Sequence, residues 1–166
     1  QENRHIDAPR TRGLLVLPDD GVMVVRDTAS RRVEGPFDQM WHLVPGADVH
    51  TISRRGVVAR HPSGDVDIHV LQVPLPGQTL PRGSTSVVEG QSNPILGWAS
   101  GPDGRRPAPV VRMRRTGTST QMVTIIATTP IGESLAAEAA FVDGGWVVDL
   151  GAHGLQRTVG IGVDGS

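Results

Sequence analysis

Hydrophobic and polar residues alternate in short runs along most of the chain, and glycine and proline separate the runs. The clearest case is the stretch GPFDQMWHLVPG at 35–46, where Phe37, Gln39 and Trp41 alternate with their neighbours. A strand places two such sets on opposite faces. We expect the first set to pack in the core, where the amide of Gln39 needs a buried hydrogen-bond partner, and His42 to face outward.

Similar runs predict strands in the rest of the chain. The tetrapeptide PDDG lies between two apolar runs and is typical of a turn, so residues 12–27 are predicted to form a hairpin. The run DVDIHVLQV predicts a strand with one apolar face and one solvated face. The solvated face would carry Asp65, Asp67 and His69. Further strands are predicted at 108–115, 120–129, 132–141 and 145–151, with a last pair within 155–163.

This pattern predicts the fold class. Residues 132–141 have helical propensity, but they also alternate, with Leu135, Ala137, Ala139 and Phe141 on one side, which favours a strand. Roughly ten to thirteen short strands at this spacing are typical of an all-β antiparallel sandwich of two packed sheets. The loops around 74–83 and 101–109 are too short to separate two domains. We therefore predict one β-sandwich domain over 1–166.

Composition narrows the function. The formal net charge is −1, and no apolar run approaches the length of a membrane span, so nothing favours a nucleic acid or a membrane as partner. Aromatic residues make up only 3% of the chain, which disfavours base-stacking platforms. The chain has no cysteine and no lysine, which excludes disulfides, thiolate zinc sites, a cysteine nucleophile, a lysine Schiff base and a P-loop lysine. It begins at Gln1 with no visible signal peptide, and we expect it to be a piece of a longer chain.

Two histidines and one carboxylate form a candidate metal site. Asp27 ends the second strand of the predicted hairpin, His42 lies on the next strand, and His5 precedes the hairpin. If those strands are neighbours, the three side chains could approach one another. Imidazoles and a carboxylate from different strands suit zinc. The alternative is that His42 is an ordinary surface histidine.

Arginines gather between 105 and 115. Arg112 and Arg114 share one face of a predicted strand, and Arg105 and Arg106 lie in the preceding loop. Guanidinium groups pair bidentately with carboxylate or sulfate, so an acidic polymer is a candidate partner. The alternative is an ordinary charged face in an arginine-rich sequence.

Three stretches in one order carry a resemblance to a known family. They are RTRGLLVLPDDGVMVVRD, then FDQMWHLVPG, then ILGWASGPDGRRPAPVVRMRRTGTSTQMVTIIATTP. Their order and spacing resemble the C-terminal β-sandwich domain of the heparinase II/III-like polysaccharide lyases, over about residues 5–131. Two histidine positions of the family pattern are filled differently here, by Pro9 or Thr11 in APRTR and by Gly35 or Pro36 before the QMWHL strand.

The resemblance implies a secreted two-part enzyme, extracellular or periplasmic, in which a helical toroid of the same parent chain precedes the sandwich. Such enzymes degrade uronic-acid polysaccharides, including glycosaminoglycans, by β-elimination. A tyrosine and a histidine of the toroid supply much of the acid and base chemistry, and this chain has no tyrosine. We therefore expect the sandwich to be inactive alone and its catalytic residues to be unknown. Some family members hold a structural zinc through histidine and aspartate, at positions that Asp27 and His42 match. The alternative function is a non-catalytic sandwich that binds acidic glycan or a protein.

Overall fold

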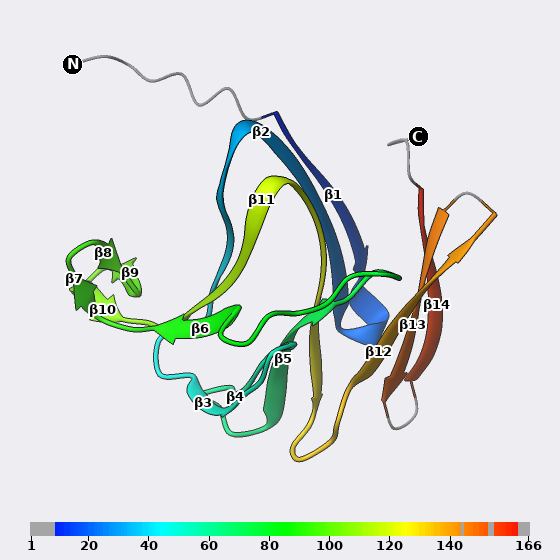
Figure 1. Ribbon diagram of the computed structural model, residues 1–166. Helices are drawn as coiled ribbons and strands as arrows, with labels where there is room; N and C mark the ends of the chain where they lie inside the picture. Colours follow the sequence, from blue (N-terminus) through cyan, green and yellow to red (C-terminus); the bar gives the residue numbers. More distant parts are fainter. Residues whose placement is uncertain (1–8, 144, 153–154, 163–166) are drawn as a thin grey trace.

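The chain forms a large curled β-sheet and a small sheet that covers one of its faces (Figure 1). The computed structural model describes residues 9–143, 145–152 and 155–162. The large sheet has the order β1 (Arg10–Leu17), β2 (Val22–His42), β11 (Val110–Pro130), β5 (Val66–Val73), β4 (Gly56–Arg60) and β3 (Asp48–Ile52), and β6 (Thr85–Val88) also pairs with β11. The small sheet has the order β12 (Ala136–Val142), β13 (Gly145–Ala152) and β14 (Leu155–Gly162). All pairings within these sheets are antiparallel, which confirms the predicted all-β sandwich-like class.

The predicted hairpin is present as β1 and β2. A short 3₁₀ turn at Pro18–Asp20 connects the strands, and Gly21 closes it with a φ of 63° and an amide that donates to the Pro18 carbonyl at 3.1 Å. Glycine adopts this left-handed conformation without steric cost. The resulting register places Arg12 directly opposite Asp27.

Strands β2 and β11 are both 21 residues long and pair with each other along most of their length. Residues 22–30 of β2 pair with 119–127 of β11, and residues 35–42 pair with 110–117. The register shifts between Gly117 and Ser119, and both strands arch over at this point (Figure 1). We call this bend the arch. The prediction of separate strands at 108–115 and 120–129 was therefore wrong, because a bulge bends a strand without ending it.

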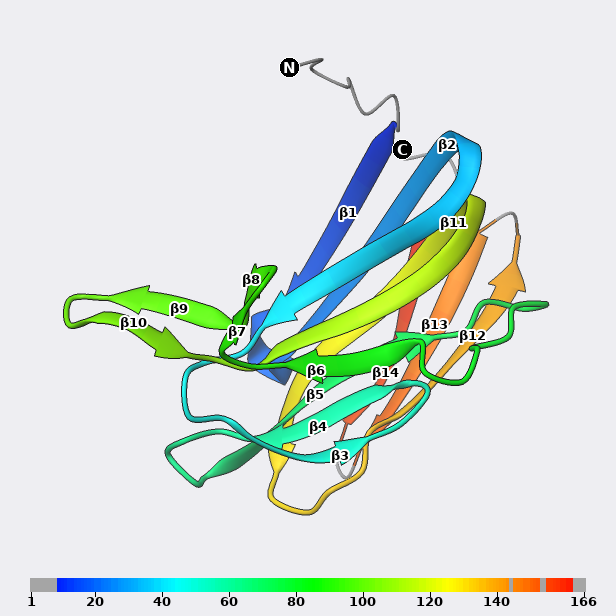
Figure 2. The ribbon, with the colours of Figure 1, turned by 60° about the vertical axis from the view of Figure 1, so that its left-hand side comes forward.

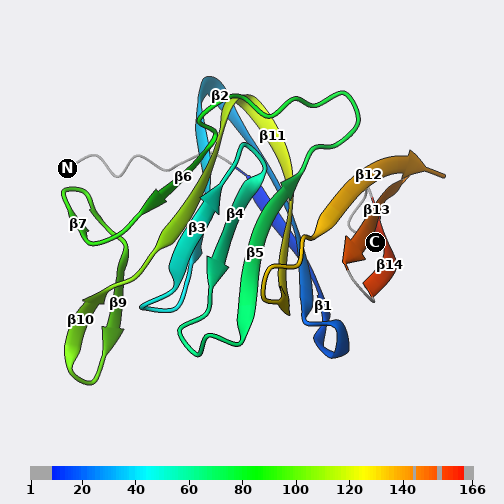
Figure 3. The same ribbon diagram turned by 90° about the horizontal axis from the view of Figure 1, so that it is seen from below.

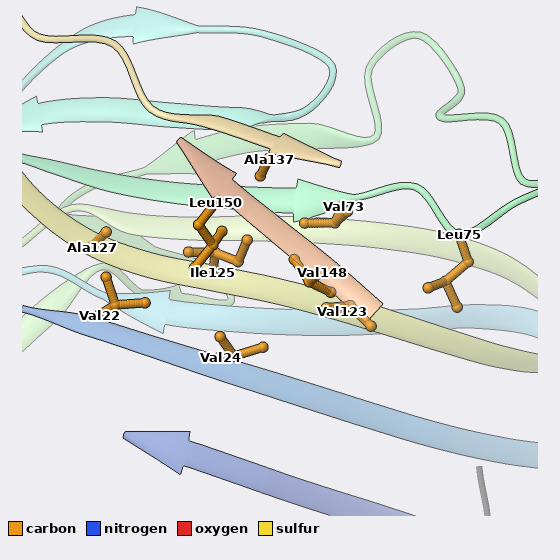
Figure 4. Close-up of a cluster of buried hydrophobic side chains, with 10 residues drawn as sticks. All are labelled: Val22, Val24, Val73, Leu75, Val123, Ile125, Ala127, Ala137, Val148 and Leu150. Carbon is orange, nitrogen blue, oxygen red and sulfur yellow. The ribbon is translucent and has the colours of Figure 1, made fainter. Parts of the chain in front are cut away.

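Two hydrophobic clusters hold the layers together. The first fills the space between the large and small sheets, where Val148 and Leu150 of β13 lie over Val123 and Ile125 of β11 (Figure 4). Ala137 belongs to this cluster, and Leu135 and Ala139 pack against it, which confirms the alternation predicted in that segment. The second cluster lies inside the curl of the large sheet and contains Leu43, Ala47, Val57, Ala59, Val70, Val111 and Met113.

The segment after β6 forms a small projecting arm (Figure 2). It contains β7 (Gln91–Ser92), β8 (Ile95–Leu96), β9 (Trp98–Gly101) and β10 (Gly104–Pro107). The indole N–H of Trp98 donates to the Gln91 carbonyl at 2.9 Å and ties the two halves of the arm together. Part of the predicted 101–109 loop is thus strand, and the described residues hold fourteen strands, one more than the predicted range. Figure 3 shows the arm at the opposite side of the molecule from the small sheet.

Candidate functional site

The alternation predicted at 35–46 is confirmed. Phe37, Gln39 and Leu43 are buried, and Trp41 packs against the second hydrophobic cluster. His42 is exposed on the other face. The outward face is therefore solvent-facing, and the inward face holds the polar group that needs a partner.

Gln39 finds its partners in a line of hydrogen bonds that runs from the surface to the core. Arg12 donates from Nε and Nη2 to the two carboxylate oxygens of Asp27, each at 2.6 Å. Gln39 Nε2 donates to Asp27 Oδ2 at 2.8 Å. Thr124 Oγ1, which is fully buried, donates to Gln39 Oε1 at 2.5 Å. We call these four residues the Arg12 network.

The guanidinium of Arg12 is held on two sides. Its carbon lies 5.1 Å from the centre of the Trp41 ring, a cation–π distance. The hydrogen bonds and the charge of Asp27 raise the pKa of Arg12. Asp27 takes the Nε and Nη2 edge, so the Nη1 side of the fork points away from that carboxylate. The side chain is 53% exposed, which leaves this free side open to solvent.

A pocket of about 270 Å³ lies beside the network. Arg10 and Arg12 of β1 and Asp27 of β2 line it, together with the apolar residues Phe37 and Met122. We call it the arch pocket, because residues from before and after the bend of β2 enclose it.

The predicted zinc ligands are placed differently. Both oxygens of Asp27 accept hydrogen bonds from Arg12, so a cationic side chain already lies where a metal would bind. His42 is on the opposite face of β2 from Gln39, whose side chain contacts Asp27. The structure thus does not bring Asp27 and His42 together, and His5 lies outside the described residues. No group of three metal-ligating residues occurs in the part of the chain that the structure describes.

The four predicted substrate-binding arginines lie on two elements. Arg105 and Arg106 are exposed on β10 of the arm, where Arg106 pairs with Asp103 at 2.5 Å. Arg112 and Arg114 lie on β11 and share a face as predicted.

Their charge environments also differ. Arg114 donates to both oxygens of Asp38 at 2.6 Å, which raises its own pKa and holds the pKa of Asp38 below the ordinary value. Arg112 donates from Nε to the Ser86 hydroxyl at 3.2 Å. Within the described residues, Arg105 and Arg112 therefore make no direct ion pair, although the charge of Arg112 helps to lower the pKa of Asp38, whereas Arg106 and Arg114 are each paired with a carboxylate.

The prediction that Asp67 and His69 lie on a solvated face of β5 is wrong, because these residues are only 1% and 2% exposed. Asp67 accepts from the Gly132 amide at 2.8 Å and from Arg60 Nε at 3.1 Å, and the Gly132 bond is the main reason that its pKa is lowered. His69 Nε2 lies 2.9 Å from Thr129 Oγ1, and burial lowers the pKa of His69. Alternation shows that two faces differ, but it does not show which of them another part of the chain covers.

Arg10 and Arg12 were missed as site residues. The register of the predicted hairpin was a usable signal for Arg12, because a turn at PDDG places Arg12 opposite Asp27. The arrival of Gln39 and Thr124 beside that pair depends on the bend of β2 and β11, for which the local pattern gives no signal.

No known protein family and no curated protein matches this chain. The described residues contain no helix that is long and apolar enough to cross a membrane.

Proposed function

We propose that this chain is the C-terminal β-sandwich domain of a heparinase II/III-like polysaccharide lyase. The parent enzyme cleaves uronic-acid-containing polysaccharide by β-elimination outside the cytoplasm, and a helical toroid of the same chain supplies the acid and base. The sandwich binds the acidic polymer and is inactive alone. Its own chemistry is therefore recognition of negative charge rather than proton transfer.

One observation carries this proposal. The first stretch forms β1 and the beginning of β2, the second forms the end of β2, and the third, which follows much later in the sequence, ends in β11, the strand that pairs with β2 on both sides of the bend. The Arg12 network takes Arg12 and Asp27 from the first stretch, Gln39 from the second and Thr124 from the third. A hydrogen-bond network that all three stretches share, from the surface to the core, supports the view that they form one functional unit, as the resemblance implies.

The charge distribution supports acidic glycan as the ligand. Arg105 on the arm makes no ion pair with a described residue and keeps an uncompensated positive charge. Arg112 on β11 makes no direct ion pair either, although its charge acts on the nearby carboxylate of Asp38, which Arg114 already holds. Arginine pairs with the carboxylate and sulfate groups of such polymers in a planar, bidentate manner. Exposed charge of this kind also makes binding sensitive to salt.

The arm favours a second candidate, a non-catalytic module that binds acidic glycan or a protein. It projects from the sheets (Figure 2). Its β10 carries the exposed Arg105, and its β8 carries Ile95, which is 67% exposed. A helical, tyrosine-containing segment upstream of Gln1 in the parent chain would favour the lyase, and a different module there would favour this alternative.

The test follows the ultraviolet absorbance of unsaturated uronate during incubation with heparin, heparan sulfate, hyaluronan, chondroitin sulfate and alginate. We expect no rise with this chain and a rise with the parent chain. Binding of the isolated chain to the same polymers should weaken as salt increases. A rise with the isolated chain, or none with the parent chain on any polymer, would contradict the proposal.

Matched variants test the arginines. Arg105→Ala and Arg112→Ala should each weaken polymer binding, whereas Arg82→Ala, which removes an exposed arginine from the loop before β6, should leave it unchanged. Equal loss in all three variants would show that only overall charge matters.

A further inference from the structure

We propose that the arch pocket binds the anionic group of a single acidic sugar residue, with Arg10 and Arg12 as its cationic ligands. Only the choice of a sugar acid as ligand rests on the proposed function. The pocket and its charges stand on the geometry of β1, β2 and β11 alone.

Charge favours an anion in this pocket. Four charged residues line it, namely Arg10, Arg12, Asp27 and Asp38. Asp27 is paired with Arg12, and Asp38 is paired with Arg114. The four lining charges sum to zero, but Arg114, which is outside the lining, neutralises Asp38, and Arg10 makes no ion pair with any residue that the structure describes. Counted with Arg114, the group therefore has an excess of one positive charge, which Arg10 carries. A monoanion would balance this excess.

The geometry of Arg12 suits a carboxylate. Asp27 occupies the Nε and Nη2 edge, and the remaining Nη1 and Nη2 hydrogens form a fork that matches two coplanar oxygens. Trp41 supports the guanidinium from its face. Arg12 is thus already ordered, and a ligand would not have to overcome the rotamer entropy of a free arginine.

The network behind Arg12 makes this position rigid. Asp27 is fixed by Gln39, and Gln39 is fixed by the hydroxyl of Thr124. Gln39 and Thr124 are 2% and 0% exposed, so neither bond competes strongly with water. These two residues are positioning residues, because they contact Asp27 or each other rather than the ligand.

Size and lining favour one sugar ring. The volume of about 270 Å³ lies just below the usual range of pockets for drug-sized molecules. Phe37 and Met122 give the pocket apolar surface beside its charges, which suits the C–H face of a sugar acid. Such a pocket has room for one unit of a polymer.

The experiment is a titration of the isolated chain with sodium glucuronate, followed by amide chemical shifts. Glucose serves as the uncharged control, and glucose 6-sulfate separates sulfate from carboxylate recognition. We expect glucuronate to shift amides of β1 and the bend of β2, and glucose to shift none of them. A response to glucose 6-sulfate but not to glucuronate would overturn the carboxylate assignment, and no response to either anion would overturn the pocket.

Variants then locate the site. Arg10→Gln and Arg12→Lys should each weaken glucuronate binding by about tenfold or more, because each loses charge-assisted hydrogen bonds. Arg82→Ala is the control. The Arg10 side chain is exposed and makes no hydrogen bond or ion pair with a described residue, so Arg10→Gln should fold normally. It therefore keeps the test valid even if Arg12→Lys is unstable. Unchanged affinity in the Arg10 variant would contradict the assignment.

The outcomes separate this inference from the proposed function. Glucuronate binding in the pocket, combined with a parent chain that cleaves no polymer, would leave the anion site standing and reject the lyase. Cleavage by the parent chain without binding in the pocket would do the reverse.

Discussion

Gln39→Leu is the sharpest test of the Arg12 network, because it removes the one residue that joins the ion pair to the core. Leucine has a similar size, so the substitution removes two hydrogen bonds without opening a large cavity. The hydroxyl of Thr124 loses its oxygen acceptor in a fully buried position, where only the sulfur of Met113 remains, at 3.9 Å. Asp27 loses one of its three donors.

The expected magnitude follows from these two losses. An unsatisfied buried hydroxyl costs about 1–3 kcal/mol, and a hydrogen bond to a charged group contributes about 1.5–3 kcal/mol. The side chain of Asp27 is 16% exposed and keeps Arg12, so its share lies at the low end. Together these values predict that Gln39→Leu lowers the free energy of unfolding by about 2–4 kcal/mol.

Urea unfolding at neutral pH measures this loss as a shift of the midpoint at constant m-value. Thr124→Val is the partner substitution, and in the Gln39→Leu background it should restore about 1–2 kcal/mol, because it removes the orphaned hydroxyl. A loss below about 0.5 kcal/mol for Gln39→Leu would refute the reasoning, since surface changes typically have that size. No recovery in the double variant would show that the Thr124 bond does not carry the effect.

Two further predictions concern stability. Burial lowers the pKa of His69 from its ordinary 6.5, so below that pH the unfolded chain takes up a proton that the folded chain does not. The free energy of unfolding should therefore fall as pH decreases from 6.5. In urea unfolding, His69→Gln should flatten this dependence on pH. The lowered pKa of Asp67 acts in a separate window, because its stabilisation is lost only as pH falls below the ordinary value of 3.8. Gly56→Ala should be strongly destabilising in thermal denaturation, because a Cβ at this position, where φ is 154°, would lie 1.9 Å from the Val70 carbonyl oxygen. The control is Gly64→Ala, whose Cβ would meet nothing within 4 Å. It should cost only about 1 kcal/mol, for placing a side chain on a left-handed backbone. A melting temperature for Gly56→Ala equal to that of the control, or a pH slope unchanged in His69→Gln, would contradict the respective argument.

The local features of the fold could be predicted from sequence because local signals specify them. The turn at PDDG sets the β1–β2 hairpin, and alternation sets the inward face of 35–46. Gln39 is instructive, because its alternation placed it inside and its amide then required a partner. The identity of that partner could not be predicted, since Asp27 reaches Gln39 only through the bend of the strand that carries both.

The bend also explains the errors in the strand count. Residues 110–130 contain Gly117 but no proline before their last residue, and they continue pairing on both sides of a register shift. In the local sequence pattern, a glycine at such a position indicates the end of a strand, whereas here it allows the strand to curve. Conversely, the glycine and proline residues around 101–109 indicate a loop, although part of this segment forms β10, which pairs with β9 in the arm.

Two of the groups that buried polar residues form differ in a way that separates structure from function. Asp67 and His69 are satisfied by Gly132, Arg60 and Thr129, and they belong to the covered side of the large sheet. That group fixes the loop after β11, and its expected signature is a pH-dependent stability.

The Arg12 network ends differently, because its last member is a half-exposed cation beside a pocket that has a second, unpaired arginine. Natural sequences depart from apolar core patterning chiefly at functional or strained sites. A change at Gln39 should therefore alter both stability and anion binding, whereas a change at His69 should alter stability alone. If both changes affected only stability, the Arg12 network would have a structural role alone, and the proposed role of Arg10 in anion binding would be refuted.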